Sequence, residues 1–102
     1  MHKIVYLPLA ESDLLNALDY IACILAAPDA ARDLLDRFDE TVKQIAEFPY
    51  ACELYRTDRP MRDEIRKVPV GNYVLYYAVF RDRIEIRRFL HSRQDSGRKF
   101  RD

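Results

Sequence analysis

The sequence predicts an α+β domain of order β-α-α-β-β-β, with a helical hairpin packed on one face of a small antiparallel sheet. Two observations predict this class. Apolar residues recur every three or four positions through most of the first half of the chain, as in amphipathic helices. After Pro49 the apolar residues instead alternate or run continuously, as in strands. At 102 residues the chain fits one domain with one modest core. We place that domain at residues 1–95 and interpret residues 96–102 as a polar tail with freedom to move.

The first half begins with a short strand and continues into two helices. Residues 3–7 are β-branched and aromatic, and Pro8 stops them and suits the first position of a helix. The first helix is predicted at about residues 9–26, with an apolar stripe at Leu14, Leu18, Ile21 and Leu25. After a break at residues 26–29, a second stripe runs from residue 31 to residue 48, and Pro49 ends it. Because the break is short, we expect an antiparallel helical hairpin.

The second half is predicted to form three strands after an irregular connection at residues 49–63. The first strand covers residues 64–69, and Gly71-Asn72 turns it into the second, residues 73–80, which is apolar throughout and fits a central strand covered on both faces. The third strand covers residues 84–91. Strict alternation would separate Ile84, Ile86, Arg88 and Leu90 on one face from Glu85, Arg87, Phe89 and His91 on the other. We expect the sheet face away from the helices to be open.

Composition excludes several classes of protein. The chain is 49% hydrophobic and 33% charged, as globular proteins are, and it contains no apolar run of the ~20 residues that a membrane helix needs. The N-terminus reaches Pro8 too soon for a signal peptide, so we expect a cytoplasmic protein. Cys23 and Cys52 are interpreted as reduced thiols, because no metal-binding spacing accompanies them. With glycine only at positions 71 and 97, phosphate-cradling loops are improbable, and we expect neither a cofactor nor a metal.

Charge is distributed unevenly along the chain. Residues 1–60 carry 6 Lys/Arg and 11 Asp/Glu, whereas residues 61–102 carry 11 and 6. A basic sheet end suits an acidic peptide or phosphates, although a sequence pI near 6.7 disfavours general nucleic-acid binding. The alternative is that the two halves neutralise each other.

The candidate site residues cluster in the last third of the sequence. Arginines there could clamp carboxylates or phosphates, or could only pair with Glu64, Glu85 and Asp95. His91 stands among them, where positive charge favours the neutral imidazole that a general base requires; the alternative is a strand-end histidine that bonds to a loop. Strand alternation separates Arg87 from Arg88, so the arginines cannot all line one surface. The candidates for binding a target or partner are Arg66, Arg87, Arg88, His91 and Arg93.

Several short motifs, in this order and spacing, resemble the RelE/ParE superfamily of type II toxin–antitoxin toxins. They are Asp13-Leu14 and Asp19-Tyr20-Ile21 on the first helix, Ala30-Ala31 and Leu34-Leu35 on the second, Arg66, Val70-Gly71-Asn72-Tyr73, and the closing Arg88-Phe89-Leu90-His91 with Arg93 and Asp95. The last group is closer to the ParE and plasmid-stabilisation branch. The resemblance implies the fold predicted above. It also implies a cognate antitoxin, a small ParD- or RelB-like DNA-binding protein that contacts operator DNA and whose flexible tail wraps the helical hairpin and the sheet.

The resemblance leaves the toxic activity open. ParE-like members poison DNA gyrase and need no hydrolytic site, which is the interpretation we prefer. RelE-like members cut messenger RNA in the ribosome with basic residues, but Val74 stands where their first arginine would fall and the tail offers Phe100 in place of a tyrosine. Arg66, His91 and Arg93 are the catalytic candidates if the chain is such an endoribonuclease. A third alternative is a non-toxic member that only binds its antitoxin. The gyrase hypothesis predicts that Arg93→Ala and removal of residues 96–102 weaken toxicity, while His91→Ala has comparatively little effect.

Overall fold

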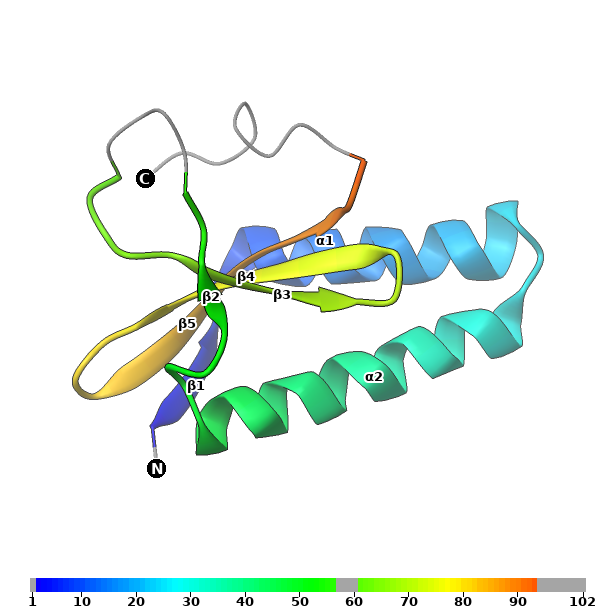
Figure 1. The fold of residues 1–102 in the computed structure, drawn as a ribbon. Helices are drawn as coiled ribbons and strands as arrows, with labels where there is room; N and C mark the ends of the chain where they lie inside the picture. Colours follow the sequence, from blue (N-terminus) through cyan, green and yellow to red (C-terminus); the bar gives the residue numbers. More distant parts are fainter. Residues whose placement is uncertain (1, 57–60, 94–102) are drawn as a thin grey trace.

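The structure is a computed structural model that describes residues 2–56 and 61–93, and it confirms the predicted α+β class (Figure 1). A pair of helices follows the first strand, and the remaining strands follow the helices. The predicted tail, residues 96–102, lies outside the described residues. In chain order the elements are β1 (Lys3–Tyr6), α1 (Pro8–Asp19), the π-helical turn η1 (Tyr20–Ile24), α2 (Pro28–Glu47), β2 (Glu53–Leu54), β3 (Arg66–Val70), β4 (Tyr73–Val79) and β5 (Arg83–His91).

The five strands form one sheet in the order β1-β5-β4-β3-β2. Neighbouring strands are antiparallel except β1 and β5, which are parallel, so the sheet is mostly rather than wholly antiparallel. β2 lies within the segment predicted to be irregular and pairs with the start of β3, Glu53 opposite Lys67 and Leu54 opposite Arg66. β3 begins at Arg66, two residues after the predicted start.

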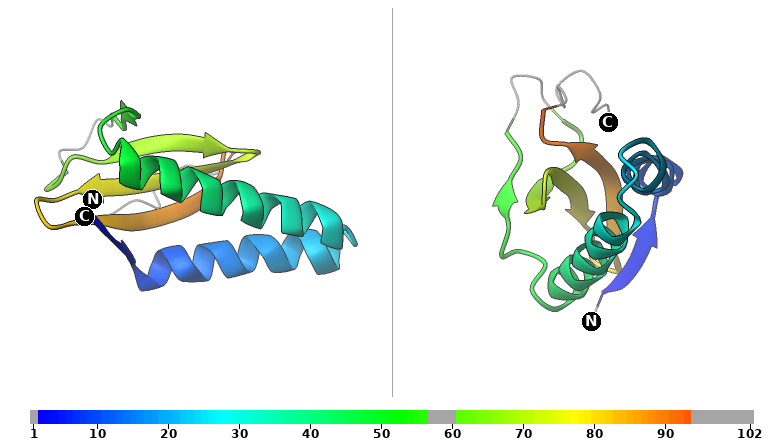
Figure 2. Two further views of the ribbon diagram at one scale, coloured as in Figure 1. Left: turned by 90° about the horizontal axis from the view of Figure 1, so that it is seen from below. Right: turned by 90° about the vertical axis from the view of Figure 1, so that its right-hand side faces the viewer.

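The helices cover one face of the sheet, as Figure 2 shows from two sides. The apolar stripe of α2 packs there against β4 and β5, with the Phe38 and Phe89 rings edge to face at 5.0 Å between centroids. The other face is not open as expected. Ile65, Tyr76, Ala78 and Leu90 form a second apolar cluster there, to which Tyr55 and Met61 of the β2–β3 connection contribute. The prediction that β4 is central and covered on both faces is confirmed, since its side chains enter both clusters.

A β-bulge changes the side-chain alternation of β5. Tyr77 lies opposite Ile86 but Tyr76 lies opposite Arg88, which leaves Arg87 as the extra residue. Beyond Arg87 the faces exchange relative to strict alternation. Phe89 therefore joins the cluster under the helices, whereas Leu90 joins the second cluster. The predicted grouping of Ile84 and Ile86 with Leu90 was wrong for this reason.

The first helix ends differently from the prediction. After Asp19 it widens into η1, where the N–H of Leu25 donates to the carbonyl of Tyr20 at 3.0 Å, five residues back. The extra residue rotates the end of the helix, so Leu25, predicted to lie in the buried stripe, is 55% exposed. Ala26 then takes a positive φ of 52° and closes the helix end. Within the described residues, no helix is long and apolar enough to cross a membrane.

Candidate functional site

A groove of about 740 Å³ runs between α1 and the C-terminal part of β5. It exists because β1 pairs only with Arg83 to Ile86, so the rest of β5 has α1 rather than a strand beside it. The lining residues are Leu9, Ser12, Asp13, Asn16, Ala17, Tyr20, Tyr73, Arg88, Phe89, Leu90, His91 and Arg93. Three of the five candidate site residues, Arg88, His91 and Arg93, are therefore brought together at one place.

A carboxylate from α1 joins the helix to β5 in this groove. Asp13 accepts hydrogen bonds from Arg88 Nε at 2.7 Å and Nη2 at 2.9 Å, and from the backbone N–H of Phe89 at 3.0 Å. The Arg88 and Asp13 side chains are only 16% and 12% exposed. Donation of hydrogen bonds to the Asp13 carboxylate raises the pKa of Arg88, against the opposing effect of its burial. Arg88 is thus held by a bidentate structural pair.

Stacked aromatic rings form the inner wall of the groove. Tyr73 stacks on Phe89 with centroids 5.1 Å apart, and the His91 ring meets Tyr73 edge to face at 5.2 Å. Partial burial, and then the proximity of Tyr20, raises the pKa of the Tyr73 hydroxyl. His91 Nδ1 accepts a hydrogen bond at 3.1 Å from the backbone N–H of Arg93. The wall is therefore rigid and leads directly to the turn that carries Arg93.

The rim of the groove is apolar and exposed. Leu9 and Tyr20, both on the side of α1 and η1 that borders the groove, are 60% and 49% exposed. Ile24 and Leu25, which follow on η1 and its C-cap, are 69% and 55% exposed. Arg93 supplies a cation at the other side of the groove, on an exposed residue. This arrangement suits an amphipathic peptide that carries an acidic group.

Arg66 lies away from the groove and ties the connection after α2 to the sheet. Its Nη1 donates to the carbonyl of Cys52 at 2.8 Å and to that of Tyr50 at 3.4 Å, and its guanidinium lies over the Tyr50 ring at 5.2 Å. Beside it, the buried Tyr77 hydroxyl donates to the carbonyl of Pro49 at 2.8 Å. These contacts give Arg66 a structural role in holding the connection.

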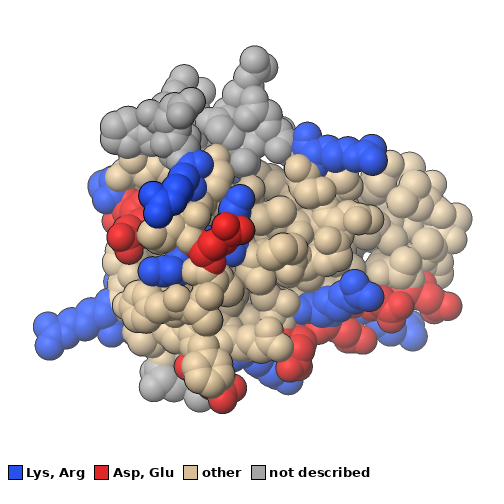
Figure 3. Space-filling view, viewed as in Figure 1, with Lys and Arg blue, Asp and Glu red and all other residues tan. Residues whose placement is uncertain are grey.

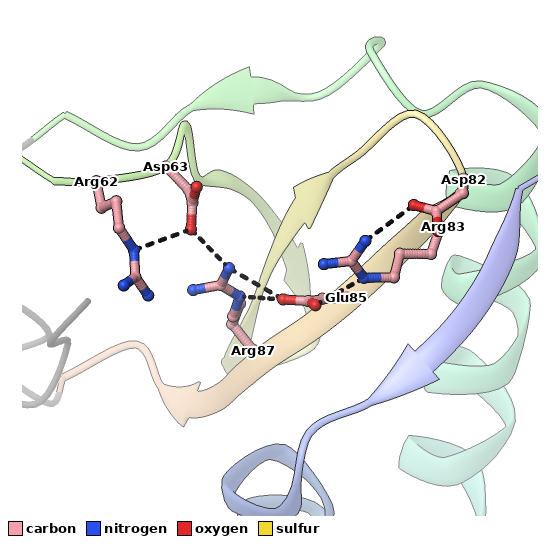
Figure 4. Close-up of polar contacts among 6 residues, drawn as sticks. All are labelled: Arg62, Asp63, Asp82, Arg83, Glu85 and Arg87. Carbon is pink, nitrogen blue, oxygen red and sulfur yellow. Dashed lines mark hydrogen bonds and ion pairs between the residues drawn. The ribbon is translucent and has the colours of Figure 1, made fainter.

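Arg87 belongs to a chain of alternating charges on the second face of the sheet (Figure 4). It donates to Asp63 at 2.9 Å and to Glu85 at 3.0 Å, and its side chain is only 11% exposed. Glu85 in turn accepts from Arg83 at 2.9 Å, and Arg83 also contacts Asp82 at 2.8 Å. Because positive and negative side chains alternate along this row, their charges cancel, and the row attracts an anion only weakly. Of the carboxylates that the sequence offered as partners, Glu85 is used here, while Asp95 lies outside the described residues.

The candidate arginines therefore do not form one basic surface. Arg66, Arg87 and Arg88 each bind a different set of oxygens, and only Arg88 and Arg93 line the groove. On the face shown in Figure 3, acidic and basic side chains lie next to each other and a wide area carries neither. In the described part of the chain, no three His, Cys, Asp or Glu side chains gather as a metal site requires.

Sequence reasoning misses two residues of the groove, Asp13 and Tyr20. Asp13 is a polar residue outside the apolar stripe of the first helix, and only the fold shows that this part of the helix faces β5. Tyr20 belongs to a motif to which the sequence gives no role. The presence of Asp13 and Arg88 in two of the quoted motifs is the one signal that could have paired them.

Two comparisons with known proteins give matches. The sequence model of the ParE toxin of type II toxin–antitoxin systems, parDE, matches residues 4–96. A solved structure described as the chromosomal ParDE TA system from P. aeruginosa superposes with a TM-score of 0.71 at 18% identity, covering 89% of this chain and 96% of that chain. At such low identity the structural likeness supports the fold. None of the curated proteins compared with the chain matches it.

Proposed function

Because the chain belongs to the family of ParE toxins of type II toxin–antitoxin systems, we propose that it arrests bacterial growth by poisoning DNA gyrase and that a cognate antitoxin neutralises it. The observation that carries the choice of target is the engagement of three candidate arginines in structural contacts. Arg66 holds backbone carbonyls, Arg87 an acidic chain and Arg88 the Asp13 carboxylate. A toxin that acts by occupying a target needs a surface, whereas a nuclease needs cations aimed at one phosphate.

The endoribonuclease alternative has little support from this geometry. Val74, where an arginine would be needed, packs against the second apolar cluster. Arg66 lies outside the groove that contains His91 and Arg93, so the three candidates for phosphate chemistry do not share one site. A scissile phosphate in the groove would meet Arg88 already paired with the Asp13 carboxylate through two hydrogen bonds. We therefore favour a toxin that acts by binding its target over one that cleaves RNA.

The shape and lining of the groove also support the proposal that an antitoxin binds this chain. Its rim offers Leu9 and Tyr20 to apolar side chains, and Arg93 offers a charge to an acidic one. A disordered tail that folds on binding can match such a pattern of anchors along an elongated groove. The exposed Ile24 and Leu25 extend the apolar surface past the end of α1. The antitoxin would thus cover the side of the hairpin next to β5.

The test is induced expression in a bacterium without the antitoxin, with growth and a DNA-damage reporter followed in the same culture. Growth arrest with a strong damage signal is expected, because trapped gyrase leaves double-strand breaks. Arrest with a silent reporter would overturn the gyrase target and make the ribosome the target. Normal growth despite soluble, folded protein would show that the chain is not toxic, and antitoxin binding would be its one remaining proposed function. Where a small antitoxin-like protein is encoded beside this one, its co-expression should restore growth, and failure to do so would overturn that pairing.

A matched pair of variants tests the surface. Arg93 and Arg81 are both exposed arginines, but only Arg93 lies at the groove, and Arg81 lies in the turn between β4 and β5. Arg93→Ala is expected to weaken arrest about tenfold, as loss of a central interface contact does. Arg81→Ala should leave it unchanged. Equal effects of the two substitutions would count against a binding surface at Arg93. Removal of residues 96–102 is also expected to weaken arrest.

A further inference from the structure

We propose that His91 is a positioning residue, whose Nδ1 fixes the turn that presents Arg93, and that it does not act as a general base. The proposal deepens the proposed function, on which its growth readout rests. The observation is the 3.1 Å hydrogen bond from the backbone N–H of Arg93 to His91 Nδ1. From the sequence alone, His91→Ala is expected to have comparatively little effect on a gyrase-type toxin. Because of this hydrogen bond, we instead expect His91→Ala to cause a partial loss of toxicity, since Arg93 would no longer be held in place.

The imidazole can hold this position because the core fixes its ring. The ring meets Tyr73 edge to face at 5.2 Å, and Tyr73 stacks on Phe89 at 5.1 Å. Phe89 in turn packs on Phe38 of α2. The position of the Nδ1 atom is thereby set by a row of rings that begins inside the main core.

The turn that follows β5 is held at two successive backbone amides. The N–H of Ser92 donates to the carbonyl of Asn72 at 2.9 Å, which ties the turn to the β3–β4 hairpin. The N–H of Arg93 then donates to His91 Nδ1. Together these bonds direct Arg93 into the lining of the groove, which the paired Arg88 also lines. Loss of the second bond would remove one of these two restraints, and the Arg93 backbone would gain freedom.

The same hydrogen bond occupies the nitrogen lone pair with which a general base would take a proton. A neutral imidazole has one nitrogen that accepts a hydrogen bond and one that carries the proton. Since Nδ1 accepts the Arg93 amide, the proton resides on Nε2, and Nε2 then has no lone pair with which to take a proton. To serve as a general base, His91 would have to give up the turn. The geometry favours positioning over proton transfer.

The connection resembles an Asx-turn, in which a side-chain oxygen accepts the N–H two residues further on. Asparagine carries its oxygen on the same carbon that carries Nδ1 in histidine, so His91→Asn can keep the bond to Arg93. Glutamine places its amide one bond further out, near the position of Nε2, so His91→Gln cannot. The two variants are similar in polarity and differ in which ring nitrogen they replace.

The experiment measures growth arrest for His91→Asn, His91→Gln and His91→Ala at matched protein level, with folding checked by thermal melting. Loss of one ordinary hydrogen bond predicts that Gln and Ala weaken arrest about threefold to tenfold. Asn should restore most of the activity. Equal and near-complete loss in all three folded variants would overturn positioning and favour a base, because none of the three substituted side chains can take a proton as imidazole does.

A second measurement does not depend on toxicity. Nitrogen-15 NMR of the wild-type protein should show the tautomer protonated at Nε2, and the Arg93 amide should exchange slowly in the wild type and in His91→Asn but fast in His91→Gln. A tautomer protonated at Nδ1, or Arg93 exchange that ignores the substitution, would overturn the proposal. If the damage reporter stays silent but His91→Asn still arrests growth more strongly than His91→Gln, the gyrase target is refuted and the positioning role is supported. If the wild type is harmless, the NMR result alone decides.

Discussion

Replacement of Asp13 by alanine tests the main connection between α1 and β5. The carboxylate accepts three hydrogen bonds from β5, two from Arg88 and one from the Phe89 amide, at 2.7, 2.9 and 3.0 Å. Its side chain is 12% exposed and that of Arg88 is 16% exposed. The alanine variant would therefore leave a largely buried guanidinium without its carboxylate and a strand-edge amide without its acceptor.

The magnitude follows from the burial. Breaking a fully buried ion pair by removing one partner costs about 3–5 kcal/mol, and the remaining exposure here places the effect near the lower end, at about 3 kcal/mol. That is a large share of the roughly 5–15 kcal/mol by which domains are stable. Asp13→Asn keeps an acceptor oxygen but loses the charge, so about 1–2 kcal/mol is expected.

Urea unfolding measures the effect directly. At an m-value of roughly 1.5 kcal/mol/M, which is usual for small domains, Asp13→Ala should lower the midpoint by about 2 M. The matched control is Asp82→Ala, since Asp82 is 76% exposed and pairs with Arg83, which is 37% exposed. Such surface pairs contribute less than about 1 kcal/mol. If Asp13→Ala changes the free energy of unfolding no more than Asp82→Ala does, the reasoning from burial is refuted.

Three further predictions concern single contacts elsewhere in the fold. Ala26→Gly should stabilise the protein by about 0.5–1 kcal/mol in urea unfolding, because Ala26 has a φ of 52°, which glycine adopts without strain; no gain would mean that the helix end relaxes. Tyr77→Phe should cost about 1 kcal/mol by the same assay, because it removes the 2.8 Å hydrogen bond to the Pro49 carbonyl; a neutral result would show that the connection after α2 is held without it. The hydrogen bond to Asp19 raises the pKa of the Cys23 thiol and so lowers its thiolate fraction at pH 8. Asp19→Asn should then speed alkylation of Cys23, read by peptide mass mapping with the second cysteine as internal control, and an unchanged rate would contradict this cause.

The order of elements could be predicted from the sequence because periodicity is a local property. The stripe of α2, the break between the two helices and the continuous apolar run of β4 each depend on neighbouring residues, and the structure confirms all three. The break is shorter than the predicted residues 26–29, because α2 already begins at Pro28. The short β2 could not be predicted in this way. Its two residues are extended because they pair with β3, and nothing in their own sequence requires it.

The candidate site was predicted less completely, for a related reason. The sequence identified Arg88, His91 and Arg93 as neighbours, and they do line one groove. It also named Arg66 and Arg87 as binding candidates, with Arg87 separated from Arg88 by strand alternation, and the structure places both outside the groove. Proximity in sequence along a strand does not fix which oxygens a guanidinium meets. That choice depends on Asp13, Asp63 and the Cys52 carbonyl, which are brought to the strands by α1 and by the connections.

The sequence by itself determined the α+β class, the helical hairpin and the central position of β4, because hydrophobic period sets which surfaces must be buried. Only the tertiary structure decided the bulge at Arg87, the widened turn after Asp19 and the partner of each arginine. The bulge and the widened turn each insert one residue, and a shift of a single residue changes which face the following side chains occupy. The oxygens that Arg88 and Arg66 meet come from elements distant in the chain. The groove between α1 and β5 likewise depends on tertiary pairing, since β1 pairs only with Arg83 to Ile86.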